Sequence, residues 1–453
     1  MNGRLLPNTT PLFRDAAGRD LHPWPFGVYA VEEDTSELPP LTIAAVTTRA
    51  TWDQSESRRF VRDLADSCEA SSIMAPLTWY RILGAGAVGF IAWQGEMWAI
   101  PLSVIAPSLI AAQPNRATAM ATAFACYAAA SLPVLAVSKA YWPSSGVQAV
   151  FIWLAAAAIL SSPWFLCWAS RPALRPWTTG VAMALTAVPP LCIMGWASPL
   201  MAAGVLFPNT AWAGVAGILA LPGLLLSEHT RMNALFTVAT ASLVLNAQVM
   251  PIGAPDGWEG ETTCIHRQPK ADYLANFIIE ERIQQTARSS RGRFLVFPEG
   301  TVARWTDATD AFWAETLSLS GKTLLIGASH PIPGSSRYNN SVVIIGEHAR
   351  PSVHQRIPVP GGMWNPLSPH GFALNLLGAG TVDVGGERAA ILICYEQLLT
   401  WPMLRSAMER PTMLIAISNE AWTSTTGVPR VQKACVRAWA RLFGLTVISA
   451  INS

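Results

Sequence analysis

ILICYEQLL, residues 391–399, places three branched apolar residues directly before Cys394, and a helix-like stretch, EQLLTWPMLRSAME, overlaps its end. A short apolar run that ends at a polar turn predicts a buried strand. The positive end of a following helix favours a thiolate, which makes Cys394 a candidate nucleophile. An isolated ILIC is more readily explained by a small buried hydrophobe, so this stretch needs support from the rest of the chain.

Similar apolar runs recur through residues 251–453. They include FLVFPE, TLLIGAS, SVVIIG, PTMLIAIS and LTVISAIN, and they alternate with helical stretches such as ADYLANFIIEERIQQTAR and VQKACVRAWARLF. SLVLNAQV, residues 242–249, is a further expected strand at the boundary. Runs of four to eight apolar residues are typical of strands buried on both faces. The alternation predicts an α/β domain with an inner sheet flanked by helices.

The composition predicts a membrane protein. Of 453 residues, 51% are hydrophobic and 13% are charged, whereas roughly 25% are charged in an ordinary soluble domain. Apolar stretches follow one another through residues 76–250, and we expect an α-helical membrane domain of about seven spans there. The expected spans are 78–93, 97–112, 118–138, 148–169, 178–197, 203–226 and 232–250.

Arginine in the short loops predicts the orientation, because positive residues are retained on the cytoplasmic side. Alternate span ends carry the 58–62 cluster, Arg81, Arg116, Arg171, Arg175 and Arg231. Only Lys139 disagrees. We therefore expect a multi-pass protein of the bacterial inner membrane, with residues 1–75 as a polar cytoplasmic segment and residues 251–453 as a periplasmic domain.

Within residues 1–75, LTIAAVTT (41–48) predicts a strand, and SESRRFVRDLADSCEA (55–70) predicts an amphipathic helix. The net charge of the whole chain is +2, and no run of basic residues suggests a phosphate-tracking surface. Nucleic-acid binding is therefore not expected.

Two further motifs follow predicted strands. Glu299 comes directly after FLVFP, and SNEAW, from Ser418 to Trp422, comes after LIAI. A carboxylate at the mouth of a buried strand loses solvation, so its pKa rises and it can act as a general base. The alternatives are a solvated loop glutamate and a turn with a helix cap. No CxxC or Cys/His spacing for a metal is present, and no cofactor is expected.

In order and character, FPEG, RYNNSVVIIG, ICYEQLL and ISNEAW with a later ISAINS resemble the carbon-nitrogen hydrolase (nitrilase) superfamily. That resemblance implies an αββα sandwich with a Glu, a Lys and a Cys at three strand ends. Seven spans before such a domain resemble bacterial apolipoprotein N-acyltransferase. The same architecture is similar to that of the TraB conjugal transfer proteins of plasmids.

The resemblance implies acyl transfer through a thioester. Glu299 would accept the thiol proton of Cys394, a membrane phospholipid would donate the acyl group, and a protein amine or a component of the conjugation machinery would be the partner. Glu396 matches a second family glutamate and Tyr395 a family tyrosine. Trp422 matches a tryptophan near the acyl chain, and Asn419 lies in the same substrate-binding segment.

The segment VHQRIPVPGGMW (353–364) departs from the family pattern. Gln355 stands at the family lysine position, and Met363 stands where a glutamate is expected. Arg356 would substitute for the lysine only through a bulge or register shift, because adjacent strand residues face opposite sides. The sequence also stops at Ser453, the last residue of ISAINS, whereas the family continues with further strands, so we expect a shortened sandwich with an uncovered edge strand.

Two other functions therefore stay open. One is a pseudo-enzyme that serves as a membrane component of the conjugation apparatus after losing the cationic corner of its site. The other is a membrane-tethered amidase. Glu299, Cys394, Tyr395 and Trp422 favour activity, whereas Gln355 and Met363 argue against it.

Overall fold

The structure, a computed structural model, describes residues 76–141, 146–250, 252–265, 273–317 and 321–453 and three short strands nearer the N-terminus. The strands β1 (Phe13–Arg14), β2 (Asp20–Pro23) and β3 (Tyr29–Ala30) form an antiparallel sheet of their own. The strand predicted at 41–48 and the helix predicted at 55–70 lie outside the described residues. Residues Ile73–Ser453 form one compact unit.

The first part of this unit is helical. A helix over 76–92 is followed by η1 (Met97–Val104), α2 (Ile105–Ala111), α3 (Arg116–Ala130), α4 (Leu132–Tyr141), α5 (Gly146–Cys167), η2 (Pro172–Leu174), α6 (Arg175–Ala187), η3 (Leu191–Met194), η4 (Pro199–Met201), α7 (Ala202–Leu206), α8 (Trp212–Leu226) and α9 (Glu228–Ala247). SLVLNAQV falls largely within α9, so the strand predicted there is wrong. A short apolar run is compatible with a buried strand or with a helix. Here the run continues a long helix, α9, and is helical.

The predicted bundle of seven spans is not confirmed. Among the described residues, α5 alone is long and apolar enough to cross a membrane, and α3 with α4 would be a second span, bent by 47°. The span expected at 178–197 stops at Ala187, before Pro189 and Pro190, and the one expected at 203–226 is interrupted between α7 and α8. Proline lacks the amide hydrogen that would continue a helix, which accounts for the first of these breaks.

Two sheets follow. The first has the order β10-β8-β7-β6-β4, with β9 beside β8, and the second has the order β11-β12-β13-β14-β5. Their bounds are β4 (Trp258–Gly260), β5 (Thr262–Thr263), β6 (Phe294–Val296), β7 (Thr323–Pro331), β8 (Arg337–Gly346), β9 (Arg350–His354), β10 (Gly371–Phe372), β11 (Thr381–Val384), β12 (Glu387–Ile393), β13 (Met413–Asn419) and β14 (Thr446–Asn452). In the second sheet β12, β13, β14 and β5 run parallel.

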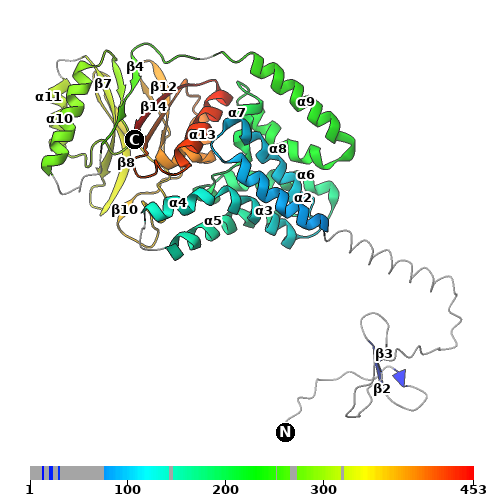
Figure 1. The fold of residues 1–453 in the computed structure, drawn as a ribbon. Coiled ribbons are helices and arrows are strands. Elements are labelled where there is room, and N and C mark those ends of the chain that lie inside the picture. The colour runs from blue at the N-terminus through cyan, green and yellow to red at the C-terminus, as the bar shows by residue number, and fades with distance from the viewer. Residues whose placement is uncertain are drawn as a thin grey trace, which may run out of the picture. The chain divides into compact units, whose positions relative to one another are not determined.

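The sheets face each other, as the alternation of side chains along the strands requires. Ile391 and Ile393 of β12 point into an apolar layer shared with Val296 and Leu325 of the first sheet. On its outer face the first sheet packs against α10 (Tyr273–Ser289) and α11 (Asp307–Leu317). On its outer face the second packs against α12 (Thr400–Ala407) and α13 (Val428–Phe443). The predicted layered α/β domain is therefore present as an αββα sandwich (Figure 1).

Helix α13 joins the sandwich to the helical part (Figure 1). It packs against α7 so closely that a Cβ atom on Gly204 would lie 1.7 Å from the carbonyl oxygen of Ala438. Only glycine permits this approach. The helical part and the sandwich thus share one continuous core.

The last strand, β14, is covered at one end of its outer edge. Ile451 and Asn452 of β14 pair with Thr262 and Thr263 of β5. Because β4 belongs to the first sheet and β5 to the second, this short segment passes from one sheet to the other. The expected uncovered edge at β14 is therefore closed in part, by an earlier segment of the chain that pairs with the last two residues of the strand.

Candidate active site

Five strand ends bring polar side chains to one corner of the sandwich. Glu299 follows β6, Asn340 lies in β8, and Gln355 follows β9. Cys394 follows β12, and Asn419 ends β13. Open and layered α/β folds collect functional groups at such strand ends. The corner therefore unites segments that are separated by more than one hundred residues.

The turn that holds Cys394 has an uncommon backbone. Cys394 has a φ of 51° and begins a short 3-10 helix, η5 (Cys394–Leu398). Positive φ is rare for a residue with a side chain and is concentrated at functional sites. The α-helix begins only at Thr400, so the helix end that was expected to favour the thiolate does not lie at the cysteine. Positive φ at Cys394 could not be predicted from the sequence.

Glu299 and Cys394 meet at this corner. The carboxyl group of Glu299 and the thiol of Cys394 are close enough for each to shift the pKa of the other. Glu299 accepts hydrogen bonds from Nδ2 of Asn340, 2.6 Å from Oε1, and from the amide nitrogen of Asn419, 3.1 Å from Oε2. Both side chains are largely buried, with 8% of Glu299 and 7% of Cys394 exposed. The corner thus brings a buried acid and a buried thiol together.

The environment favours the neutral forms of both groups. Burial raises the pKa of Glu299, and hydrogen bonds from Cys394, Asn340 and the Asn419 amide offset part of that rise. Burial and the nearby Glu299 charge raise the pKa of Cys394 well above its usual range. The backbone amides of Asn419 and Tyr395 act on the sulfur in the opposite direction. No cation is among the causes that act on either group, so the surroundings favour the thiol over the thiolate.

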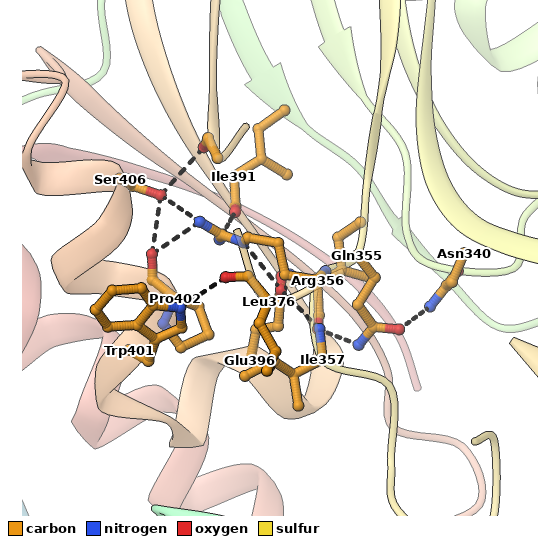
Figure 2. Close-up of polar contacts among 12 residues, drawn as sticks. Asn340, Gln355, Arg356, Ile357, Leu376, Ile391, Glu396, Trp401, Pro402 and Ser406 are labelled. Carbon is orange, nitrogen blue, oxygen red and sulfur yellow. Dashed lines mark hydrogen bonds and ion pairs between the residues drawn. The ribbon is translucent and has the colours of Figure 1, made fainter. Parts of the chain in front are cut away.

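Gln355, which was expected at the family lysine position, is a neutral link between the sheets. Its Oε1 accepts a hydrogen bond from Nδ2 of Asn340 at 2.8 Å, and its Nε2 donates to the carbonyl of Ile393 at 2.8 Å. Figure 2 shows the bond between Asn340 and Gln355. Asn340 also donates to Glu299, so the two amides connect Glu299 to β12, the strand before Cys394.

Arg356 points away from the reactive pair. Its Nε lies 3.1 Å from Oε1 of Glu396, and both side chains are 1% exposed. Its Nη1 donates to the carbonyl of Pro402 and to Oγ of Ser406, both at 2.9 Å, and its Nη2 donates to the carbonyl of Ile391 at 3.0 Å (Figure 2). The guanidinium of Arg356 is therefore paired with Glu396 and does not contact Glu299 or Cys394 through any of these bonds. In this arrangement Arg356 does not substitute for the lysine.

Glu396 holds the cysteine turn against the segment after β9. Its Oε1 accepts hydrogen bonds from the amides of Arg356 at 2.7 Å and Ile357 at 3.3 Å. Its Oε2 accepts one from the amide of Ile393, the residue before Cys394, at 3.1 Å. Glu396 is thus a positioning residue beside the site, and it does not contact Glu299 through any of these bonds.

The other predicted residues surround the corner at different distances. The Tyr395 hydroxyl donates to the carbonyl of Ile193 in η3 at 2.9 Å, which ties the cysteine turn to the helical part. Trp422 is half-buried in the turn after β13. Met363 is also half-buried, and its backbone bonds hold the loop from Val359 to Phe372 without reaching the reactive pair.

Sequence reasoning missed three polar residues that support the corner. Asn340 contacts Glu299, Gln432 of α13 donates to the carbonyl of Cys394 at 2.9 Å, and Asn452 donates to Oδ1 of Asn419 at 3.0 Å. All three are buried. An amide inside an apolar run, as in RYNNSVVIIG and ISAINS, was the available signal.

The described residues contain no group of three or more His, Cys, Asp or Glu side chains that could hold a metal ion. The groups at this corner are an acid, a thiol and amide donors. Such a set is suited to nucleophilic transfer of an acyl group.

Two solved structures resemble the C-terminal region. One is an amidase of the nitrilase superfamily from Nesterenkonia, at 14% identity and a TM-score of 0.32, covering 44% of this chain and 78% of that chain. The other is a carbon-nitrogen hydrolase from Helicobacter pylori, at 12% identity and a TM-score of 0.33, covering 42% of this chain and 71% of that chain. At these scores the likeness carries no argument about the site.

No protein-family model matches the sequence. Two curated relatives cover most of it. The conjugal transfer protein TraB of Agrobacterium fabrum is 30% identical over 393 residues, which are 82% of this chain and 92% of that protein. A probable conjugal transfer protein TraB of Sinorhizobium fredii is 29% identical over 384 residues, 81% of this chain and 96% of that protein. The family resemblance is confirmed, and the chain belongs to the TraB family of conjugal transfer proteins.

Proposed function

We propose that this chain is a membrane-embedded acyltransferase of plasmid conjugal transfer, with Cys394 as nucleophile and Glu299 as general base. The observation that carries the proposal is a buried acid beside a buried thiol, Glu299 and Cys394, with the thiol on a strained turn. A positive φ held at Cys394 costs of order 1–3 kcal/mol, and surrounding structure retains such strain mostly at functional sites. A merely structural cysteine has no need of it.

The proposed reaction runs in two steps. Glu299 accepts the thiol proton as the sulfur of Cys394 attacks the ester carbonyl of a phospholipid, and the protonated Glu299 then returns that proton to the departing alkoxide. The products are a thioester and a lysophospholipid. In the second step an amine attacks the thioester, its proton passes to Glu299 and then to the sulfur, and the amide leaves. A raised pKa suits Glu299 to both transfers.

The helical part supports a membrane location. Six helix ends lie near arginine residues. They are the last turns of α2, α5 and α8 and the first turns of the 76–92 helix, α6 and α9, and the arginines are Arg81, Arg116, Arg171, Arg175 and Arg231. The opposite helix ends approach the sandwich: Gly95 meets Arg430, and Trp212 packs on Phe443. The arginine end of the bundle agrees with a cytoplasmic location, and the opposite end, which carries the sandwich, agrees with a periplasmic one.

Aromatic and apolar side chains cover the outside of the same helices. Trp79, Tyr80 and Trp177 are exposed at the arginine end, and Trp98 is exposed at the end near the sandwich. Such belts mark the two interfaces of a membrane. A helix of 15 residues, such as α8, is about 23 Å long and falls short of the hydrocarbon core of about 30 Å. We therefore propose a bundle that thins the bilayer locally or spans it in part.

This placement would bring the site to its substrate. Tyr395, next to Cys394, bonds to η3 in the helical part, so the cysteine turn lies against the end of the bundle that would face the periplasm. A phospholipid ester at the bilayer surface could then reach the sulfur without full extraction into water. The half-buried Trp422 would contact the acyl chain.

A second candidate is a pseudo-enzyme that acts as a scaffold in conjugation. It is favoured by the neutral Gln355 and by the raised pKa of Cys394, because one missing charged donor can cost about a hundredfold in rate. The limited exposure of Cys394 favours it as well. A membrane-tethered amidase would use the same residues on a soluble amide.

Intact-mass measurement on purified protein with phospholipid separates these functions. We expect an acyl adduct on the parent chain, none on Cys394→Ala, and faster adduct formation on Gln355→Lys. An adduct that appears only with Gln355→Lys would establish the pseudo-enzyme, and hydrolysis of a small amide without any lipid adduct would establish the amidase. Plasmid transfer by cells that carry Cys394→Ala reports whether conjugation needs the reaction or only the protein.

A further inference from the structure

The arginine end of the bundle contains two like charges side by side. Arg81, in the 76–92 helix, donates through Nη1 to the carbonyl of Ala112 at 2.7 Å. Arg175, at the start of α6, donates through Nη1 to the carbonyl of Ala111 at 3.1 Å and through Nε to Ala169 at 3.1 Å. The two guanidinium groups therefore sit on consecutive carbonyls at the end of α2 and repel each other.

The hydrogen bonds that cap the end of α2 engage only some of the N–H donors of Arg81 and Arg175. Each guanidinium has five N–H donors, and these bonds engage one donor of Arg81 and two of Arg175. A helix end contributes only about half a negative charge. Within the part of the chain that the structure describes, neither arginine forms an ion pair. The pair thus keeps free donors and uncompensated positive charge.

The surroundings of the pair are those of a membrane interface. Arg175 stacks on Trp168, with its Cζ 5.0 Å from the ring centroid, and Trp168 donates to the carbonyl of Gln113 at 3.1 Å. Trp79 and Trp177, near the two arginines in sequence, are 64% and 75% exposed. The cavity beside Arg175 has a volume of about 10 Å³, room for one water molecule, so a ligand would sit on the outside of the bundle.

We infer that Arg81 and Arg175 bind the phosphate of an anionic phospholipid head group, with the exposed tryptophans against its acyl chains. Guanidinium forks match phosphate oxygens geometrically. A lipid is favoured over free phosphate because charge and apolar surface adjoin at the same helix ends. This inference rests on the proposed membrane location, and it adds a lipid site at the end of the bundle away from Cys394.

Native mass spectrometry of the full chain, released from nanodiscs of phosphatidylcholine with a minor share of phosphatidylglycerol, tests the site. We expect retained phosphatidylglycerol in the parent chain, and retention weakened roughly thirtyfold in the double variant Arg81→Gln/Arg175→Gln, at about fivefold for each basic side chain. Arg231→Gln is the matched control, because Arg231 caps α8 through the carbonyl of Leu225 as a single arginine. Inorganic phosphate should not displace the lipid.

Several results would overturn the inference. They are equal retention of the two lipids by the parent chain, displacement by inorganic phosphate, and a loss in Arg231→Gln as large as in the double variant. If the double variant unfolds, the comparison of lipids on the parent chain decides. Failure of the parent chain to enter nanodiscs would refute the membrane proposal itself, whereas entry without lipid preference would refute this site alone.

Discussion

Gln355 and Arg356 are neighbours in sequence, yet they belong to two polar clusters of opposite design (Figure 2). Gln355 joins the reactive corner, in which Glu299 has only neutral donors. Arg356 joins a brace, in which its buried charge meets Glu396 and three further oxygen acceptors. The buried cation of this region therefore holds the cysteine turn, and no positively charged side chain among the described residues bonds to Glu299.

The difference shows what a buried charge requires. Glu396 receives three backbone amides and a guanidinium, so its ionised form is well compensated. Glu299 receives an amide side chain and one backbone amide, and its pKa rises because these donors do not replace lost hydration. The brace therefore satisfies its buried charge with donors, whereas the corner around Glu299 favours the protonated acid.

The largest effect is expected from breaking the brace. Glu396→Ala leaves the Arg356 guanidinium buried without its partner, and removal of one member of a buried pair costs about 3–5 kcal/mol. Denaturant unfolding measures the loss. Replacing both residues, as Arg356→Met with Glu396→Leu, should recover much of it, since no charge then stays buried. A loss below about 1 kcal/mol in Glu396→Ala would show that the pair is not a brace.

A smaller effect is expected from Asn340→Ala, which opens the reactive corner. It removes the donor that Glu299 and Gln355 share, and an unsatisfied buried acceptor costs about 1–3 kcal/mol. The pKa of Glu299 should rise further, and adduct formation on Cys394 should change more than in Asn339→Ala. The neighbouring Asn339 lies in the same strand with its side chain on the opposite face, so it is a matched control. Equal effects of the two variants would contradict the assigned role of Asn340.

The sequence locates Glu299 and Cys394 better than the residues that support them. Each follows a short apolar strand, and that local signal was sufficient to place both at strand ends. The brace depends on residues 40 apart in sequence that meet only in the folded sandwich. Neither the partner of Arg356 nor the direction of its side chain is encoded in a local pattern, so its binding to Glu396 could not be predicted.

In the helical part, too, a local sequence pattern predicts some features and not others. Hydrophobic stretches correctly indicated helices between 76 and 250, but length in an apolar window does not fix helix continuity. Each interruption lies beside a proline: Pro133 follows the bend after Ala130, Pro208 precedes Trp212, and Pro189 and Pro190 follow the stop after Ala187. Pro163 in α5 and Pro222 in α8, by contrast, lie inside continuous helices. A proline in the sequence therefore marks where a helix can break, but it does not fix which helices do.

The next effect is the pH dependence of the free energy of unfolding that Glu299 contributes. The folded-state pKa of Glu299 is raised, so its protonated form stabilises the fold fully below the unfolded pKa of about 4.3, and this contribution is lost as pH rises through the folded pKa. The side chain of Glu299→Gln is neutral at every pH, so this variant should abolish the decline.

Thermal unfolding of the parent chain and Glu299→Gln across acidic to neutral pH measures this difference. The two curves should lie closest at the acidic end and separate as pH rises, with the variant more stable at neutral pH. Parallel curves over the whole range would mean that Glu299 is ionised as easily in the folded chain as in the unfolded one, and the proton-holding role of the corner would be refuted.

The smallest effect is expected from an ion pair with the same chemistry as the brace but in water. Arg293 and Glu347 lie 3.8 Å apart, with 63% and 49% of their side chains exposed. Exposed pairs contribute about 0–1 kcal/mol because hydration competes with the attraction, so Glu347→Gln should change the free energy of unfolding by less than about 1 kcal/mol. High salt should reduce even this difference, whereas it should leave the effect of Glu396→Ala nearly unchanged, because buried pairs are poorly screened. Equal salt sensitivity of the two variants would place the Arg356–Glu396 pair in contact with solvent and would remove the contrast between brace and surface.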